Sequence, residues 1–248
     1  FNYSETHHLN NLWIRGGFPK SFLAKTINDS YRWREFYIDN FLERDIPALG
    51  FNIPAETLRK FWMMIAHYHG NILNASEIGR SFGVTNKTII SYLDILVGTF
   101  MIRELKPWFE NIKKRQVKSS KIYIRDSGIL HNLLAIKSSD NLQIHPKLGA
   151  SWEGFALEEV IRYHKFSRKD CFFWATHNGA ELDLLVKNAS TNIGFEFKYS
   201  SAPKKTKSMQ IALETLKLDK IYVVCPGKDL YKLAKNIEVI GLEHYLQS

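Results

Sequence analysis

Two neighbouring stretches, AELDLLVK (180–187) and IGFEFKYS (193–200), place acidic side chains inside strand-like apolar runs. Alternation of apolar and polar residues with period two predicts a β-strand with one buried face in each stretch. The predicted buried face of the first stretch holds Leu182, Leu184 and Val186. Asp183 and Glu196 then lie on the polar faces, and a fold for this chain must compensate both charges.

The loop between the two stretches sets a register. If the four residues NAST (188–191) form the loop, Lys187 pairs with Asn192 and Asp183 lies opposite Glu196. At an effective dielectric constant of 20, two unit charges 5 Å apart repel by roughly 3 kcal/mol. A divalent cation, Mg²⁺ or Mn²⁺, offsets such repulsion because it binds one or two carboxylates together with water and phosphate oxygens.

Lys198 follows Glu196 by two residues and shares its face. A lysine in this position can orient or deprotonate an attacking water and neutralise charge that develops on a phosphate. The same register places Glu181 opposite Lys198. The alternative is therefore an ordinary Glu181–Lys198 ion pair on an uncovered sheet, with Asp183 and Glu196 facing water.

The first half of the chain is typical of a winged helix. Helices are predicted over 28–43 and 56–69, and a helix-turn-helix pattern follows in which Asn74 and Thr85 cap the two helices. Predicted strands over 101–108 and 121–128 flank the basic stretch 113–121. The residues expected to contact DNA are Asn86, Lys87, Thr88, Ser91, Lys113, Lys114, Arg115 and Lys118. The alternative is a protein-contact module with a solvated basic loop.

The second half has a different order of elements. A helix over 151–166, a meander of three strands joined first by Asn178-Gly179, a helix over 203–217 and a strand over 220–225 are predicted. A short helix over 229–235 and a last strand complete the chain. The expected domains are a helical lead-in (1–50), a winged helix-turn-helix domain (51–136) and an αβββαβ domain with a mixed sheet (148–248), separated from the winged helix by a polar segment.

This arrangement resembles the PD-(D/E)XK nuclease superfamily. The matching residues are Asp183 in ELDLL and Glu196 and Lys198 in FEFK, with Glu153 in GASWEGF on the preceding helix. The resemblance implies a restriction-endonuclease-like fold in which Asp183 and Glu196 bind the metal, Lys198 assists the nucleophilic water and Glu153 completes the acidic cluster. The sheet order and the alternation of the polar face add weight to the short motif.

The chain as a whole resembles the C-terminal region, of unknown function, that follows the ATPase domain in many prokaryotic AAA-type ATPases. The segments LWIRGGFP, YIDNFLERDI, IYIRDSGILHNLL and GASWEGFALEEVI carry this likeness. It implies that the ATPase domain of the same parent chain is a partner and that this chain, which begins with Phe1, is a fragment. The sequence holds no G-x-x-x-x-G-K-[ST] phosphate loop, so we expect any ATP hydrolysis to belong to residues outside it.

Composition favours polyanionic partners and excludes several other classes. The formal net charge is +9, which favours DNA. The apolar runs are far shorter than the roughly 20 residues of a membrane-spanning helix, so no membrane partner is expected. Cys171 and Cys225 form no CxxC pair, which fits a reducing cytoplasm and indicates no cysteine-based zinc site. The only histidine kept as a catalytic candidate is His177, although a surface position in its hairpin is the stronger expectation.

Two functions remain in competition. The leading hypothesis is a Mg²⁺-dependent nuclease-like domain that hydrolyses phosphodiester bonds in DNA as part of an ATPase. The alternative is a catalytically inactive DNA-binding, regulatory or protein-interaction module of that ATPase. The substrate structure and the oligomeric state are left open by the sequence.

Overall fold

The computed structural model describes residues 1–109 and 117–247. The chain divides into two compact units, the first comprising Phe1–Glu104 and Ile122–Gly154 and the second Leu105–Lys121 and Phe155–Ser248. The division falls inside helix α11 (Leu148–Tyr163), between Gly154 and Phe155 and so beyond the polar segment 137–150 in which the sequence predicts a domain boundary. Helices and nine strands give the described residues the mixed α/β class that the sequence predicts.

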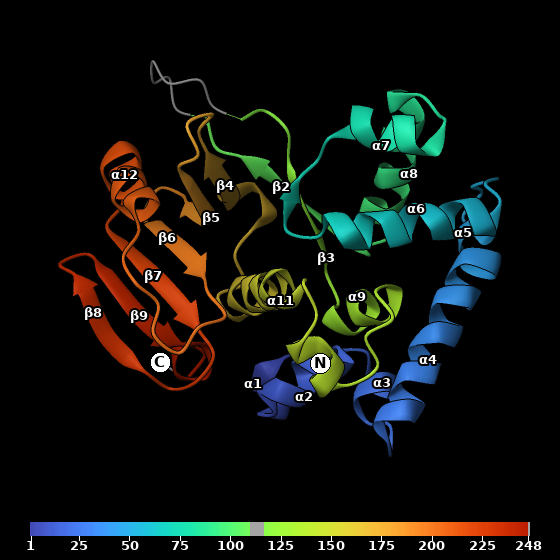
Figure 1. Ribbon diagram of the computed structural model, residues 1–248, viewed down its shortest axis with the longest axis horizontal. Coiled ribbons are helices and arrows are strands. Elements are labelled where there is room, and N and C mark those ends of the chain that lie inside the picture. The colour runs from blue at the N-terminus through green and yellow to red at the C-terminus, as the bar shows by residue number, and fades with distance from the viewer. Residues whose placement is uncertain (110–116, 248) are drawn as a thin grey trace. The chain divides into compact units, whose positions relative to one another are not determined.

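The first unit is mostly helical (Figure 1). Its helices are α1 (Tyr3–Thr6), α2 (Leu9–Arg15), α3 (Pro19–Phe22), α4 (Ile27–Asn40), the π-helix η1 (Phe41–Asp45), α5 (Ile46–Ala48), α6 (Ala55–Tyr68), α7 (Ala75–Phe82), α8 (Asn86–Gly98), α9 (Ser127–Leu133), α10 (Ser139–Gln143) and the start of α11. Its strands are β1 (Asn71–Ile72), most of β3 (Lys121–Ile124) and the start of β2 (Ile102–Pro107), in the order β1-β3-β2.

The predicted helix-turn-helix pattern is confirmed at the level of its elements. The Asn74 side chain accepts the Glu77 N–H at the start of α7. Gly83 ends α7 with a φ of 68°, a conformation that glycine adopts without strain. Thr85 then caps α8 by accepting the Thr88 N–H at 3.2 Å. The turn between the two helices is therefore fixed by local chemistry that is readable in the sequence.

A buried chain of hydrogen bonds links three segments of the first unit. The Trp13 indole N–H donates to Ser151 Oγ at 3.0 Å, and His131 Nε2 lies 2.7 Å from the same hydroxyl. His131 Nδ1 lies 3.2 Å from the Ile14 carbonyl oxygen, which can only accept, so Nδ1 carries the proton. The Ser151 hydroxyl then donates to Nε2. Every member is satisfied when the imidazole is neutral.

The second unit is built around a mixed sheet. Its strands are the end of β2, β4 (Cys171–Ala175), β5 (Glu181–Lys187), β6 (Asn192–Phe197), β7 (Lys220–Cys225), β8 (Leu230–Ala234) and β9 (Ile237–Gly241), in the order β2-β4-β5-β6-β7-β9-β8. Its helices are the end of α11, the 3₁₀ helix η2 (Arg168–Asp170), α12 (Lys207–Leu216) and α13 (Leu242–Tyr245). The antiparallel meander β4-β5-β6 is confirmed, and β7 joins β6 in parallel after α12.

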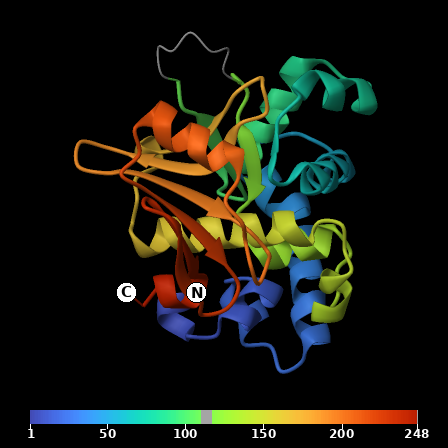
Figure 2. The same cartoon turned by 60° about the vertical axis from the view of Figure 1, so that its left-hand side comes forward.

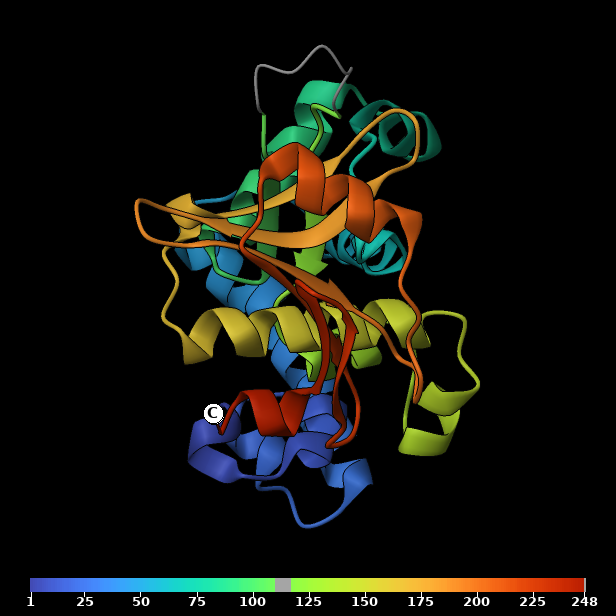
Figure 3. The same ribbon diagram turned by 90° about the vertical axis from the view of Figure 1, so that its left-hand side faces the viewer.

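Helix α12 lies across one face of this sheet (Figures 2 and 3). Met209, Ala212 and Leu216 pack there against a core that includes Val223 of β7. Tyr222, the neighbour of Val223, points to the other face because side chains alternate along a strand. It packs there on Tyr245 of α13, with ring centroids 5.2 Å apart. The sheet is therefore covered on both faces within its own unit.

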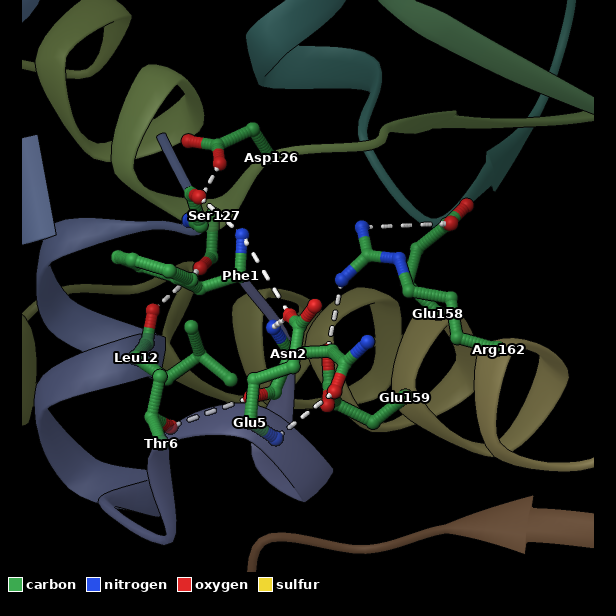
Figure 4. Close-up of polar contacts among 11 residues, drawn as sticks. Phe1, Asn2, Glu5, Thr6, Leu12, Asp126, Ser127, Glu158, Glu159 and Arg162 are labelled. Atoms are coloured by element: carbon green, nitrogen blue, oxygen red, sulfur yellow. Dashed lines mark hydrogen bonds and ion pairs between the residues drawn. The ribbon is translucent and has the colours of Figure 1, made fainter. Parts of the chain in front are cut away.

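Two buried carboxylates of α11 share one arginine in the second unit. Arg162 Nη1 donates to Glu159 Oε1 at 2.7 Å, and Nη2 lies 3.7 Å from Glu158 Oε2 (Figure 4). Buried carboxylates are costly unless they are paired, so Arg162 accounts for two acidic residues on a largely buried helix.

The predicted helix over 229–235 is wrong, since Leu230–Ala234 forms the edge strand β8. It pairs antiparallel with β9, with Tyr231 opposite Val239. The free edge of β9 has backbone N–H and C=O groups without partners in the sheet. A strand can pair with these groups and a short helix cannot, so the segment forms β8. Lys232 lies on this outer strand, where a charged side chain discourages pairing with another chain.

Within residues 1–109 and 117–247, the helices are all too short or too polar to span a bilayer.

Stability below neutral pH is expected to depend on His131. Burial, ahead of every other cause, lowers the pKa of His131 to about 3. The unfolded chain takes up a proton below about pH 6.5 and the folded chain does not, so stability falls as the pH drops from about 6.5 towards 3. The slope from this residue approaches about 1.4 kcal/mol per pH unit.

Chemical denaturation at a series of pH values measures this slope. His131→Gln should reduce the slope of the unfolding free energy against pH by up to about 1.4 kcal/mol per pH unit between pH 6 and 4. His177→Gln, at an exposed hairpin position, is the matched control and should keep the wild-type slope. Equal slopes in the two variants would contradict the assignment.

Candidate functional site

A β-bulge in β5 shapes the candidate site. Phe172 of β4 pairs with Leu185 of β5, and Trp174 pairs with Leu182, so two steps along β4 match three along β5. The extra residue falls at Asp183 or Leu184. Leu182 and Leu185 consequently pack into the same core beneath α12. The prediction that Leu182, Leu184 and Val186 share one buried face is therefore wrong, because a bulge reverses the alternation.

The predicted register of the β5–β6 hairpin is confirmed next to the loop. Lys187 pairs with Asn192, and the described ladder continues to Leu184 and Phe195. It ends one pair before Asp183 and Glu196. Beyond this point the Asp183 carboxylate links the two strands, because its Oδ2 accepts a hydrogen bond from the Phe197 N–H at 3.0 Å. The predicted backbone pair of Asp183 and Glu196 is therefore replaced by a hydrogen bond from the Phe197 backbone to the Asp183 side chain.

Glu196 of β6 and Lys198, which directly follows this strand, complete the cluster. Lys198 Nζ lies 3.0 Å from Glu196 Oε2 and 4.0 Å from Asp183 Oδ2. Both carboxylates are buried, whereas the Lys198 side chain is 42% exposed. The structure therefore brings Asp183, Glu196 and Lys198 together, with the lysine reaching the surface.

Lys121 is the site residue that sequence reasoning missed. The sequence predicts it at the end of the basic stretch 113–121 and at the start of the strand 121–128, and it does begin β3, where it is only 3% exposed. Its ammonium pairs with Glu181 and lies 3.3 Å from Asp183 Oδ1. The signal in the sequence is its position directly before the apolar run IYI, where the loop gives way to a buried strand.

The electrostatics of the two acids are opposite. Burial alone raises the pKa of Asp183, but the Lys121 and Lys198 ammonium groups and the Phe197 N–H outweigh it and hold the pKa below its ordinary value. Burial, reinforced by the charge of Asp183, raises the pKa of Glu196 to about 8 despite the nearby lysines. Of the two acids, Asp183 therefore keeps its negative charge more readily than Glu196 at neutral pH.

The donor set of this cluster fits a hard divalent cation. Asp183 and Glu196 offer carboxylate oxygens, and an oxygen that accepts one hydrogen bond keeps a second lone pair. Within the described part of the chain, no group of three or more His, Cys, Asp or Glu side chains is arranged to hold a metal. A cation bound by this pair would therefore take its remaining ligands from water or substrate.

Glu153 belongs to the first unit, whereas Asp183, Glu196 and Lys198 belong to the second. Its carboxylate accepts a hydrogen bond from the Tyr123 hydroxyl at 2.6 Å. Its place in an acidic cluster stays a prediction.

The residues expected to contact DNA fall into three groups. Asn86, Lys87 and Ser91 are exposed on α8, and Lys118 is exposed after β2. Thr88 is half-buried, with its hydroxyl 3.1 Å from that of Thr85. Lys113, Lys114 and Arg115 lie outside the described residues.

These features define the class: a mixed α/β chain with a buried Asp–Glu–Lys cluster in the sheet of its second unit. The chain belongs to the family of the domain of unknown function DUF8612, whose model matches residues 6–140, more than half of the sequence. A second family model, the domain of unknown function DUF4143, matches residues 148–245. The latter contains Glu153, Asp183, Glu196 and Lys198.

Two curated relatives are uncharacterised proteins of Mycobacterium bovis and Mycobacterium tuberculosis. Each is 44% identical over 235 residues, which cover 95% of this chain and 53% of the relative. The chain thus spans about half the length of these relatives. No solved structure matches the chain.

Because the pKa values of the two acids shift in opposite directions, neutralising each acid should change the stability by a different amount. At pH 7 without metal, Asp183→Asn should destabilise the fold by about 3 kcal/mol, because it strips Lys121 of a buried counter-charge. Glu196→Gln should change the stability by less than about 1 kcal/mol or raise it, because the pKa near 8 leaves Glu196 mostly protonated.

Urea denaturation in the presence of a chelator compares the two variants. Equal losses of stability would show that the charge does not reside on Asp183.

Proposed function

We propose that the chain is a Mg²⁺-dependent nuclease-like module that hydrolyses phosphodiester bonds in DNA. The observation that carries the proposal is the convergence of Asp183, Glu196 and Lys198 at the end of the β5–β6 hairpin. It combines two carboxylates suited to a hard cation with an ammonium group that reaches the surface. The meander followed by α12 and β7 supports a restriction-endonuclease-like fold for residues 148–248.

Asp183 and Glu196 would hold Mg²⁺ or Mn²⁺, which supplies Lewis-acid stabilisation of the charge on the scissile phosphate when bound. Lys198 orients or deprotonates the attacking water and neutralises charge that develops on the phosphate. Its 42% exposure leaves it accessible to a nucleotide. The Phe197 N–H fixes Asp183, so the carboxylate is oriented before substrate arrives.

The first unit would bind DNA as a winged helix. Two observations support this: the elements follow one another along the chain in the order α6, β1, α7, α8, β2, β3, and the strands lie side by side in the sheet in the order β1-β3-β2. Lys87 and Ser91 are exposed on α8, the second helix of the helix-turn-helix, which enters the major groove in such proteins. An ATPase domain of the same parent chain would be the partner, in line with the resemblance to ATPase C-terminal regions.

The purified chain should cut DNA in Mg²⁺ or Mn²⁺, and Lys198→Ala should abolish the cleavage without unfolding the protein. Loss of a transition-state contact of this kind costs about 10²-fold or more in rate. Gel assays on single-stranded, duplex and branched DNA measure it, with circular dichroism to monitor the fold.

Lys169→Ala removes an exposed lysine of η2 in the same unit and is the matched control, expected to cut like the wild type. The absence of cleavage of all three substrates by the wild-type chain would refute the nuclease activity.

A second candidate function is a DNA-binding or regulatory module that keeps the nuclease fold without catalysis. The observation that favours it is the presence of two ammonium groups, Lys121 and Lys198, on the acid pair. Such a cluster is already charge-compensated without a metal. DNA binding and protein contact are separable within this alternative, because only the former releases counterions in proportion to the phosphates contacted.

Three residues of the basic stretch 113–121 can be replaced to test whether it contacts DNA. Replacing Lys113, Lys114 and Arg115 by alanine should weaken DNA binding and reduce the salt slope, d log K/d log[salt], by about 2 to 3 units, since each phosphate contact contributes about 0.9. Fluorescence anisotropy across a salt series measures the slope.

Alanine replacement of Lys204, Lys205 and Lys207, which are exposed in the second unit, removes the same charge elsewhere and serves as the control. Equal slopes for the two triple variants would favour a protein-interaction role for the basic stretch.

A further inference from the structure

Lys121 is the member of the cluster that neither the predicted register nor the nuclease resemblance includes. It lies on the Oδ1 side of Asp183, whereas Phe197 N–H and Lys198 lie on the Oδ2 side. The exposures of the two lysines differ sharply, with 4% for the Lys121 side chain and 42% for that of Lys198. Asp183 is therefore flanked by one enclosed ammonium group and one that reaches the surface.

Glu181 holds the enclosed ammonium in place. It pairs with Lys121 from the same strand that carries Asp183. A buried ammonium group is costly unless carboxylates surround it, so Lys121 loses more by leaving the cluster than an exposed lysine would. Lys198 can turn towards solvent when a ligand enters, while Lys121 is expected to stay.

A fixed positive charge beside Asp183 limits what the site can bind. Two-metal sites hold their cations about 3.5–4 Å apart on a shared carboxylate, which requires both oxygens of that carboxylate to be accessible to metal. A cation on the Oδ1 side would lie within a few ångströms of the Lys121 ammonium and would be repelled strongly in this buried setting.

We propose that Lys121 is a resident counter-ion of Asp183, which restricts the site to one divalent cation and weakens the binding of that cation. The proposal deepens the proposed function, because it rests on Asp183 and Glu196 being metal ligands. Lys121 acts here as a positioning residue: it contacts Asp183 and sets its charge balance, without contacting substrate.

Calorimetric titration of the metal-free full chain with Mn²⁺ tests the proposal without DNA. The wild type should bind about one equivalent. Lys121→Gln, whose amide can still donate hydrogen bonds to Glu181 and Asp183, should bind Mn²⁺ on the order of tenfold more tightly or take up a second equivalent. Lys121→Met tests the loss of charge without replacement hydrogen bonds.

Lys220→Met is the matched control, since Lys220 pairs with Glu238 in the same sheet and outside the cluster. Its Mn²⁺ binding should equal that of the wild type. A folded Lys121→Gln protein with wild-type affinity and stoichiometry would overturn the inference, as would the absence of Mn²⁺ binding by both proteins.

The two proposals fail separately in this design. If the wild type binds one Mn²⁺ and Lys121→Gln binds it more tightly, but no DNA is cut, the nuclease activity is refuted and the role of Lys121 stands. If DNA is cut and the substitution leaves Mn²⁺ binding unchanged, the role of Lys121 is refuted and the nuclease activity stands.

Discussion

The contact between the Asp183 carboxylate and the Phe197 N–H links the charge of the cluster to the pairing of the sheet. A buried carboxylate is tolerated only when hydrogen bonds and opposite charges replace its hydration, and here one backbone N–H and two ammonium groups do so. The same contact ties β5 to β6 where their ladder ends. The bulge in β5 is what directs Asp183 onto this N–H, so the geometry of the sheet and the charge of the site depend on one another.

Much of this arrangement is readable in the sequence. The four-residue loop after Lys187 set the hairpin register, and Thr85 marked the start of α8, because both depend on local backbone chemistry. The bulge was not predictable in the same way. It is defined by the partner strand, where Phe172 and Trp174 pair with residues three apart, and apolar residues on both sides of Asp183 fit either alternation.

Lys121 and β8 show a second limit of sequence reasoning. The lysine-rich stretch before β3 has the composition of a solvated loop, and only acids some sixty residues later draw its last lysine inside. Strand β8 likewise forms because β9 has an unpaired edge. The acids that bury Lys121 are distant along the chain, so local composition does not predict its burial. The partner of β8 is the next strand, β9, but β9 offers an edge only because its other side pairs with β7.

The segments that suggested the ATPase-associated resemblance are explained in part by packing alone. The Asp126 carboxylate accepts the N–H groups of Gly17 and Ile129, which joins the RGG segment to the RDSG segment. A Cβ at Gly16, whose φ is 79°, would overlap the Asp126 carboxylate. These residues therefore serve the packing of the first unit, and they carry no argument for catalysis.

The acid–lysine cluster differs in kind from those segments. Stability alone does not require two carboxylates and two lysines inside a sheet, since well-packed apolar residues of similar volume are often at least as stable as buried ion pairs. The raised pKa of Glu196 marks a charge that folding disfavours. Residues with strongly perturbed pKa values are enriched at functional sites, and the proposed function rests on this cluster for that reason.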